Sequence, residues 1–461
     1  MCLAFALFAL GVAVLLGPAQ TGSAQSPALT PTPCPSCTTP TATPTPSCSC
    51  TPTPTSTPMP NIPLNDLGPR TYKRAPGTWG SKGGLYKEGS NQRPTHHDMA
   101  GQAIAATVIT PRGQDGSPTP APDGKIGLLS LGMSNAQLEF SGSKDAFISR
   151  ANGNGPNPDL AKDSNVVLVN AAKAGKGAAE WANLNDDAWM HAMDKVTAAN
   201  LSAAQIQVVW MEHTLKFPTG SFQDSEQLLQ GYLTTIAKNV LTEFSNCKII
   251  FLSTRTESYT ITLPHNPEPY AYETGFANKL TIQAQTDHTD LCFDDPTHFY
   301  SCDPVVAPYI CWGPYSWIDG PTPRSDGKTW NCSDLESDDW VHPTACGIHK
   351  VADQLLAFFE TNPIATPWYL NKNTSNMTIS SLNYTVCPGS RFYTVQFCAD
   401  VSGGTGSLRY SWDFDDGDFD YDNPTPTKSF PAPGTYNVHL TVVDSGGNHA
   451  QGTIALTPPP P

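Results

Sequence analysis

Ser134 is the first residue of the sequence whose surroundings indicate chemistry. It follows the apolar run KIGLLSLG (125–132) in the order Gly132-Met133-Ser134-Asn135. A buried strand that ends in this way presents a hydroxyl group in a loop, either within an ordinary turn or as a nucleophile. A serine hydroxyl is not ionised at neutral pH, so a nucleophilic Ser134 needs a histidine base and an acceptor that orients the imidazole.

A carboxylate and a histidine with suitable spacing occur near the other end of the same region. Asp339 and His342 stand in DDWVHPTACGIHKVADQLLAFF (338–359), just before a segment whose apolar spacing predicts a helix. In a tight loop, this separation lets the carboxylate reach one imidazole nitrogen while the other faces outward, and Pro343 suits the first turn of the helix. Each segment alone has an ordinary interpretation, as a turn or a helix cap. Together they predict a triad of Ser134, His342 and Asp339.

The elements between these two segments are expected to bring them together. Short runs rich in β-branched residues (KIGLLSLG, NVVLVNAA, QIQVVWME and KIIFLSTR) alternate with amphipathic stretches, of which SEQLLQGYLTTIAKNVLTEF (225–244) is the clearest. This alternation predicts a parallel sheet with helices on both faces. Ligands bind at the carboxyl ends of the strands in such sheets, and Ser134 follows the first strand.

The pattern changes after residue 366. In RFYTVQFCADVSG (391–403) and TYNVHLTVVDSGG (435–447), apolar and polar residues alternate and no helical spacing survives. Residues 375–457 are therefore expected to form a small all-β sandwich of the immunoglobulin-like kind. Residues 366–374 would link this unit to the preceding one, and residues 458–461 would form a proline tail.

The N-terminal part of the chain predicts export. Residues 1–24 are apolar and end in the small residues Gly22-Ser23-Ala24, as in a secretory signal peptide, and the apolar run is too short to cross a bilayer. Residues 25–60 are rich in Pro, Thr and Cys and predict an extended linker. Residues 61–365 then hold the α/β domain. The mature chain is expected to be secreted or at the cell surface, in an oxidising compartment.

Charge and cysteine content limit the partners and the redox state. The formal net charge is −15, with 26 Lys+Arg against 41 Asp+Glu and no basic run, which argues against nucleic acid. Twelve of the thirteen cysteines fall outside the signal segment, in three even-numbered groups: Cys34, Cys37, Cys48 and Cys50; Cys247, Cys292, Cys302, Cys311, Cys332 and Cys346; Cys387 and Cys398. Local disulfides are favoured over zinc binding for the first group. The grouping predicts that residues 61–365 fold and pair their cysteines without the C-terminal unit.

The two segments around Ser134 and His342 resemble blocks of the SGNH hydrolases, also called GDSL-type esterases and lipases. Gly132-Met133-Ser134 stands where that family has Gly-Asp-Ser, with Met in place of Asp, and Asp339-x-x-His342 matches its last block. The resemblance covers about residues 95–360. It implies a flavodoxin-like three-layer α/β sandwich and hydrolysis of esters, often acyl groups on carbohydrates and lipids, with no metal or cofactor.

The resemblance also implies an oxyanion hole formed by the Ser134 amide, a glycine and an asparagine. Gly175, in VNAAKAGKGAAEW (169–181), matches the glycine, and Gly177 is the alternative. The family's Gly-x-Asn-Asp block is absent. The corresponding strand end reads VVWMEHT (208–214), where His213 is the candidate donor. Loss of one such donor costs about 10²- to 10³-fold in rate.

The C-terminal unit resembles the PKD domain. The family signature Trp-Asp-Phe-Gly-Asp-Gly appears as WDFDDG (412–417). The resemblance implies a buried Trp412, an Asp/Gly turn and a role as a spacer or surface contact in secreted enzymes. Cation binding by Asp413, Asp415, Asp416 and Asp418 is a secondary interpretation.

A second acidic segment, QTDHTDLCFDDPTHFYSCD (285–303), could also bind a cation. It contains cysteines and reads more readily as a solvated lid, closed by a disulfide from Cys292 to Cys302 or Cys311.

These observations predict a secreted, monomeric serine esterase that acts on esters of carbohydrate or another surface polymer. The alternative is a catalytically weak or inactive surface protein on the same scaffold, which binds carbohydrate or mediates adhesion; the missing third block favours it. A glycosidase lacks a candidate pair of carboxylates. The distance between Ser134 Oγ and His342 Nε2 discriminates between the first two hypotheses.

Overall fold

The computed structural model describes residues 62–75, 77–155, 159–261, 263–371, 377–387, 393–430 and 433–458. The expected signal peptide, the linker 25–60 and most of the proline tail lie outside these residues. Within the described ranges, no helix combines the length and apolar character that a membrane crossing requires.

A parallel sheet of five strands forms the centre of the α/β part. The strands are β3 (Ile126–Gly132), β4 (Val166–Asn170), β5 (Ile206–Glu212), β6 (Ile249–Ser253) and β7 (Tyr309–Trp312), in the order β4-β3-β5-β6-β7. All four pairings are parallel. Every residue of β3, β5, β6 and β7 is buried, which explains why these segments are continuously apolar in sequence.

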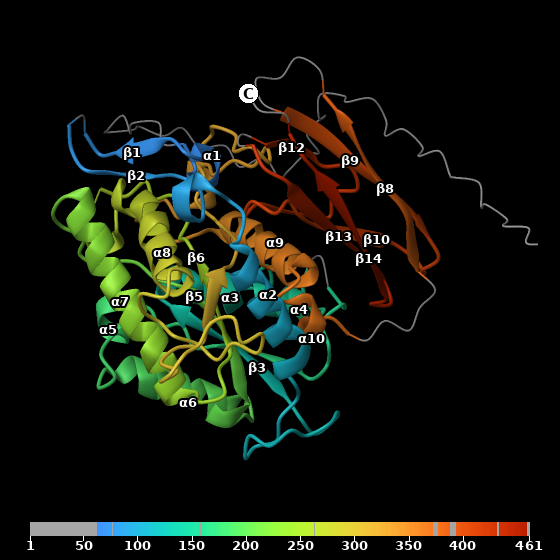
Figure 1. Cartoon of the computed structure of the whole chain (residues 1–461), viewed down its shortest axis with the longest axis horizontal. Helices are drawn as coiled ribbons and strands as arrows, with labels where there is room; N and C mark the ends of the chain where they lie inside the picture. Colours follow the sequence, from blue (N-terminus) through green and yellow to red (C-terminus); the bar gives the residue numbers. More distant parts are fainter. Residues whose placement is uncertain are drawn as a thin grey trace, which may run out of the picture. The chain divides into compact units, whose positions relative to one another are not determined.

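Helices cover both faces of this sheet (Figure 1). One face packs against α5 (Ala178–Trp181), α6 (Asp187–Ala198), α7 (Phe222–Glu243) and α8 (Tyr270–Thr286). The other packs against α2 (Thr95–Ala103), α3 (Ser134–Ser141), α4 (Phe147–Ala151), α9 (Ala345–Thr361) and α10 (Thr366–Tyr369). Successive residues of β5 alternate between the two cores, with Val209 and Met211 in the first and Val208 and Trp210 in the second. The predicted parallel sheet between helical layers is confirmed.

Three short elements precede this part of the chain. They are α1 (Leu64–Leu67) and the antiparallel pair β1 (Thr71–Lys73) and β2 (Gly80–Lys82).

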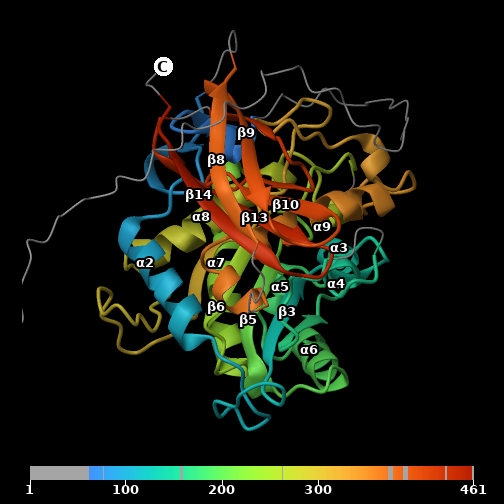
Figure 2. The ribbon, with the colours of Figure 1, turned by 90° about the vertical axis from the view of Figure 1, so that its right-hand side faces the viewer.

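The C-terminal part consists of two antiparallel sheets (Figure 2). One contains β11 (Phe419–Tyr421), β10 (Leu408–Asp413), β13 (Tyr436–Asp444) and β14 (His449–Leu456), in that order; the other contains β12 (Thr427–Phe430), β9 (Tyr393–Ser402) and β8 (Thr378–Val386). Their inner faces share an apolar core that includes Trp412, which is fully buried as expected.

Apolar residues connect the sheets of the C-terminal part to the α/β part. Phe419, Tyr421 and Val443 belong to the same buried cluster as helix α9. The ring centroids of Phe358 and Phe419 lie 5.3 Å apart in an edge-to-face arrangement. The two parts therefore share one of the apolar cores of the molecule.

Buried charges also cross this boundary. Arg324 Nε lies 2.9 Å from Asp418 Oδ1, and both side chains are fully buried. Lys428 Nζ lies 2.7 Å from Asp416 Oδ2 and donates a hydrogen bond to Ser325 Oγ. Asp416 and Asp418, in the turn between β10 and β11, thus pair with cations. No group of His, Cys, Asp or Glu that could hold a metal ion occurs in the described part of the chain.

The cysteines are paired only in part as expected. Cys292 and Cys302 form a disulfide, and Cys332, Cys387 and Cys398 are also disulfide-bonded. Cys247 and Cys311 are buried free thiols, so the expected complete pairing of their group is wrong. Cys247 lies in the core on one face of the sheet and Cys311 in the core on the other, where their thiols cannot meet.

Candidate active site

Ser134 lies at the carboxyl edge of the parallel sheet. Strand β3 ends at Gly132, Met133 caps the following helix with extended backbone angles, and Ser134 is the first residue of α3. The first amide groups of a helix have no partner within it, and the helix dipole is positive at this end. The Ser134 hydroxyl group thus lies where a substrate carbonyl group can bind. A negative charge that develops on the carbonyl oxygen can be accommodated at the same place.

His342 joins Ser134 to Asp339. The distance between His342 Nε2 and Ser134 Oγ is 2.7 Å, and His342 Nδ1 forms a short hydrogen bond with Asp339 Oδ2. An ionised carboxylate only accepts hydrogen bonds, so Nδ1 carries the proton of the neutral imidazole. Nε2 is then free to accept the Ser134 proton, as a general base must.

Backbone hydrogen bonds hold the carboxylate of Asp339 in place. Its Oδ1 accepts from the amides of Val341, at 2.9 Å, and His342, at 3.0 Å. Partial burial favours the neutral acid, but these bonds and the bond from the imidazole outweigh it and lower the pKa of Asp339. Asp339 is therefore ionised at neutral pH and orients the imidazole.

The loop that carries these two residues is tied to its surroundings. Leu335 forms an isolated bridge with Pro343, and the Glu336 amide donates to the His342 carbonyl at 2.8 Å. Thr344 caps α9, so Pro343 precedes the cap and does not occupy the first helical turn as expected. The histidine loop is thus fixed at both ends.

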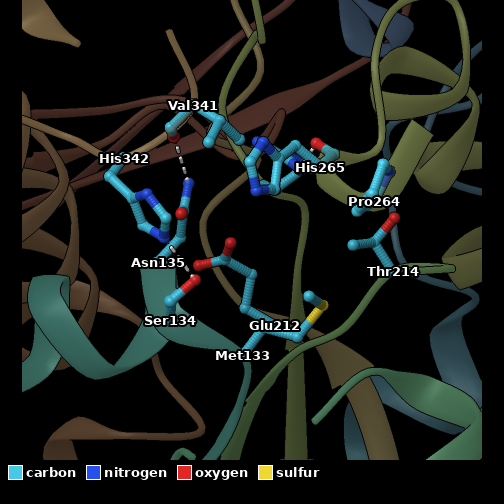
Figure 3. A pocket seen from close by; sticks show the side chains of 10 residues that line it. Met133, Ser134, Asn135, Glu212, Thr214, Pro264, His265, Val341 and His342 are labelled. Carbon is cyan, nitrogen blue, oxygen red and sulfur yellow. Dashed lines mark hydrogen bonds between the residues drawn. The ribbon is translucent and has the colours of Figure 1, made fainter. Parts of the chain in front are cut away.

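A pocket opens beside the triad (Figure 3). Figure 3 shows Glu212 rising from the end of β5 with its carboxyl group turned toward Ser134 and His342. The residues that line the pocket are Met133, Ser134, Asn135, Glu212, Thr214, Arg255, Pro264, His265, Val341 and His342.

Two buried glutamates lie next to the nucleophile. Glu139 on α3 and Glu212 are 0% and 5% exposed. Burial raises the pKa of both, and the Glu139 carboxyl raises that of Glu212 further. Arg255 is also buried, and its positive charge partly offsets this effect. Both carboxyl groups therefore favour the protonated form more than a solvent-exposed glutamic acid does.

The candidate oxyanion residues occupy different places. Gly175 has a left-handed backbone (φ 78°) in the turn after β4, and its carbonyl accepts from Lys216 Nζ at 2.9 Å. The amide of Gly177 is already bonded to Glu180 Oε2 at 3.0 Å. Neither glycine is among the described residues that line the pocket. Of the expected donors, only Ser134 lines it.

The structure does not bring His213 into the pocket. Its ring lies 5.8 Å from that of Trp181, on the face of β5 opposite to Glu212, and burial lowers its pKa to about 3. Consecutive residues of a strand point to opposite faces, so a strand that directs Glu212 at the pocket directs His213 away from it. Neither ring nitrogen has a hydrogen-bond partner among the described residues.

Acidic side chains of the loop after α8 form ion pairs and hydrogen bonds with other residues of the chain. Asp287 pairs with Lys87 at 2.8 Å and Asp290 with Lys238 at 2.9 Å. Asp295 accepts from the amide of Tyr300 at 2.8 Å. These contacts agree with a structural role for the loop, and Cys292–Cys302 closes it.

Four residues at or behind this pocket were not expected from the sequence: Asn135, Glu139, Glu212 and Arg255. Asn135 follows the nucleophile directly, and its side chain donates to the Val341 carbonyl at 3.0 Å. An acidic residue at the end of a largely apolar strand was the available sequence signal for Glu212. Glu139 and Arg255 reach the site only through the fold.

Comparisons with known proteins identify one part of the chain. Residues 383–457 match the family model of the PKD domain, and no curated protein matches the sequence. The solved PKD1 domain of the metalloprotease PrtV from Vibrio cholerae is 24% identical, with a TM-score of 0.16, and the match covers 18% of this chain and 94% of that one. An extracellular lipase from Streptomyces rimosus is 12% identical, with a TM-score of 0.25, and the match covers 50% of this chain and 98% of that one. The chain thus carries a PKD domain behind the α/β part that holds the pocket.

Proposed function

We propose that the protein is a secreted serine ester hydrolase of the SGNH or GDSL type. The observation that carries this proposal is the continuous chain of hydrogen bonds from Ser134 through His342 to Asp339. Nucleophile, base and orienting carboxylate are the three groups that acyl transfer by serine requires. They come from loops at one edge of a parallel sheet, where such folds bind ligands.

The reaction proceeds in two halves. Ser134 Oγ attacks the ester carbonyl carbon while His342 Nε2 takes its proton, and the carbonyl oxygen becomes an oxyanion. The bond to the leaving alcohol then breaks, and His342 returns the proton to that alcohol. Water attacks the acyl-enzyme with His342 again as base, which releases the carboxylic acid and restores the Ser134 hydroxyl.

The oxyanion is stabilised first by the backbone amide of Ser134, at the N-terminus of α3. Gly175 stays the second backbone donor in this proposal, because its turn follows the neighbouring strand β4 at the same edge, although it does not line the pocket. Its left-handed backbone favours glycine at this position.

The same proposal includes the assignment of each part of the chain to a fold type. The strand order β4-β3-β5-β6-β7 is the order of flavodoxin-like sheets. The two antiparallel sheets of the C-terminal part suit an immunoglobulin-like sandwich. The PKD match and the Cys292–Cys302 disulfide support export.

The substrate class in this proposal is an acylated carbohydrate or another ester on a surface polymer, bound by a monomeric enzyme. A PKD domain joined to a hydrolase suits an insoluble or extended substrate, because it can hold the polymer near the pocket and raise its local concentration. Neither nucleic acid nor a resident metal takes part.

Hydrolysis of a short-chain aryl ester tests the proposal. Purified protein is expected to release the alcohol, and Ser134→Ala is expected to abolish turnover while circular dichroism and Tm stay unchanged. Hydrolysis by the variant at the wild-type rate would exclude Ser134 as nucleophile. Absence of hydrolysis of any ester by the wild type would favour the alternative of a surface-binding protein.

A further inference from the structure

The register between strands β3 and β5 places Glu212 beside the nucleophile. Strands β3 and β5 are neighbours in the sheet, and Gly132 pairs with Glu212. Ser134 follows Gly132 by two residues, so the glutamate and the nucleophile leave the sheet edge side by side. Both line the same pocket, and the Glu212 carboxyl is turned toward Ser134 (Figure 3).

Other side chains of the pocket are less suited to bind the carbonyl oxygen of an ester. Asn135 Nδ2 is engaged with the Val341 carbonyl. Arg255 donates through Nε to the Thr256 carbonyl at 3.3 Å and through Nη1 to the His265 carbonyl at 3.0 Å, and its Nη2 is buried without a hydrogen-bond partner among the described residues. Thr214 Oγ1 lies 3.5 Å from Thr274 Oγ1. Glu212 has no such engagement with a backbone carbonyl among the contacts of the described residues.

An ionised Glu212 would repel a negative charge that forms on the substrate, whereas the neutral acid has a hydroxyl proton to donate. The groups that face Glu212 are the carboxyl of Glu139, the guanidinium of Arg255 and the imidazoles of His265 and His342. Burial and Glu139 raise the pKa of Glu212, and the charge of Arg255 opposes this rise. A buried carboxyl group that stays protonated at neutral pH is an established kind of oxyanion donor in enzymes.

We propose that the carboxyl group of Glu212 is the side-chain hydrogen-bond donor to the oxyanion that forms at Ser134. This role rests on the proposed function. The Glu212 proton stays on its oxygen throughout, and the proton exchanged with Ser134 is carried by His342 alone.

Substitutions at Glu212 test the role through the kinetics of aryl ester hydrolysis. Glu212→Ala removes the donor and is expected to lower kcat about 10²- to 10³-fold with little change in KM, since the bond strengthens in the transition state. Glu212→Gln keeps a neutral donor and is expected to hold kcat within about tenfold of the wild type. Gln207→Ala, at the other end of β5, controls for loss of packing in this strand.

The pH profile supplies the readout that a purely structural role would not move. Wild-type kcat is expected to fall at alkaline pH as Glu212 loses its proton, and the Glu212→Gln profile is expected to lack this fall. Wild-type kcat in Glu212→Ala, or an unchanged alkaline limb in Glu212→Gln, would overturn the role.

A spectroscopic measurement decides the matter if Glu212→Ala does not fold. Difference infrared spectra of the wild type, recorded as a boronic acid forms its tetrahedral adduct with Ser134, are expected to show a shift of the protonated-carboxyl band. That band is expected to be missing in Glu212→Gln. If Ser134-dependent hydrolysis occurs and no such band exists, the Glu212 role alone fails. If no hydrolysis depends on Ser134, the proposed function fails and this role fails with it.

Discussion

The Asn135 side chain donates a hydrogen bond to the carbonyl of Val341 at 3.0 Å, across 206 residues of sequence. Asn135 follows the nucleophile on α3, and Val341 precedes the base on its loop. One buried hydrogen bond thus joins a side chain of the segment that carries Ser134 to the backbone of the segment that carries His342.

Asn135→Ala is therefore expected to impair positioning without removing a reacting group. The loss of one buried hydrogen bond corresponds to about tenfold in rate, and we expect a decrease of that size in kcat on an aryl ester with KM nearly unchanged. Gln137→Ala on the same helix is the matched control. A wild-type kcat in Asn135→Ala would mean that the histidine loop is positioned by other contacts.

Asp339→Asn tests the orientation of the imidazole. The amide side chain can donate to Nδ1 and so favours the tautomer with the proton on Nε2, which cannot accept from Ser134. We expect kcat to fall about 10³- to 10⁴-fold while the fold is retained. A decrease below about tenfold would show that His342 takes its orientation from elsewhere.

The pH dependence of stability is expected to contain a contribution from Glu226. This side chain on α7 is 1% exposed, and neither of its oxygens has a hydrogen-bond partner among the described residues. Burial, reinforced by Glu273, raises its pKa from 4.5 to about 8. The folded chain thus holds a proton that the unfolded chain releases, so the stability contribution is complete below pH 4.5 and is lost as pH rises toward 8.

Glu226→Gln removes this linkage. Between pH 4.5 and 8, the Tm of the wild type is expected to fall more steeply than that of the variant, and the variant is expected to be the more stable protein at the upper end. Thermal unfolding followed by circular dichroism measures both slopes. Parallel slopes would show that Glu226 is ionised in the folded protein.

The buried ion pair of Arg324 and Asp418 is expected to couple the stability of the α/β part to that of the C-terminal part. Arg324→Met leaves the Asp418 carboxylate buried with one cation fewer, and removal of one partner of such a pair costs about 3–5 kcal/mol. Glu88→Gln breaks an exposed pair with Lys82 and serves as a control without a measurable effect on Tm. Equal Tm values for the two variants would contradict the coupling.

Removal of residues 375–461 is also expected to destabilise the α/β part. The deletion exposes Arg324, Asp326 and the outer face of α9, which are buried in the intact chain. We expect the truncated chain to unfold at a lower temperature and to lose ester hydrolysis, unlike the independent domain that the cysteine grouping predicts. A truncated protein with wild-type Tm and activity would show that the interface contributes little.

Local patterns in the sequence predict much of this architecture. The four apolar runs became four neighbouring strands of the parallel sheet, and the clearest helical pattern lies within α7. These patterns are local because strands buried on both faces are continuously apolar and amphipathic helices repeat every 3.6 residues. The proposed triad could be predicted because Asp339 and His342 are close in sequence and Ser134 directly follows an apolar run.

The remaining features depend on contacts between distant segments. Glu139 and Glu212 meet because α3 and β5 pack together, and no spacing in the sequence reports this. Glu212 and His213 are adjacent at one strand end, and the sequence alone does not decide which of them lines the pocket. The docking of the Asp/Gly turn onto Arg324 likewise could not be read from a signature that predicts only the turn.

Labelling with a fluorophosphonate probe tests the central claim most directly. The probe phosphonylates a serine whose hydroxyl is activated by a neighbouring base, and peptide mapping by mass spectrometry locates the adduct. The account predicts an adduct on Ser134 that is absent in Ser134→Ala and forms at least about tenfold more slowly in His342→Ala. An adduct on a different residue, or hydrolysis of esters by a protein whose Ser134 is never labelled, would contradict it.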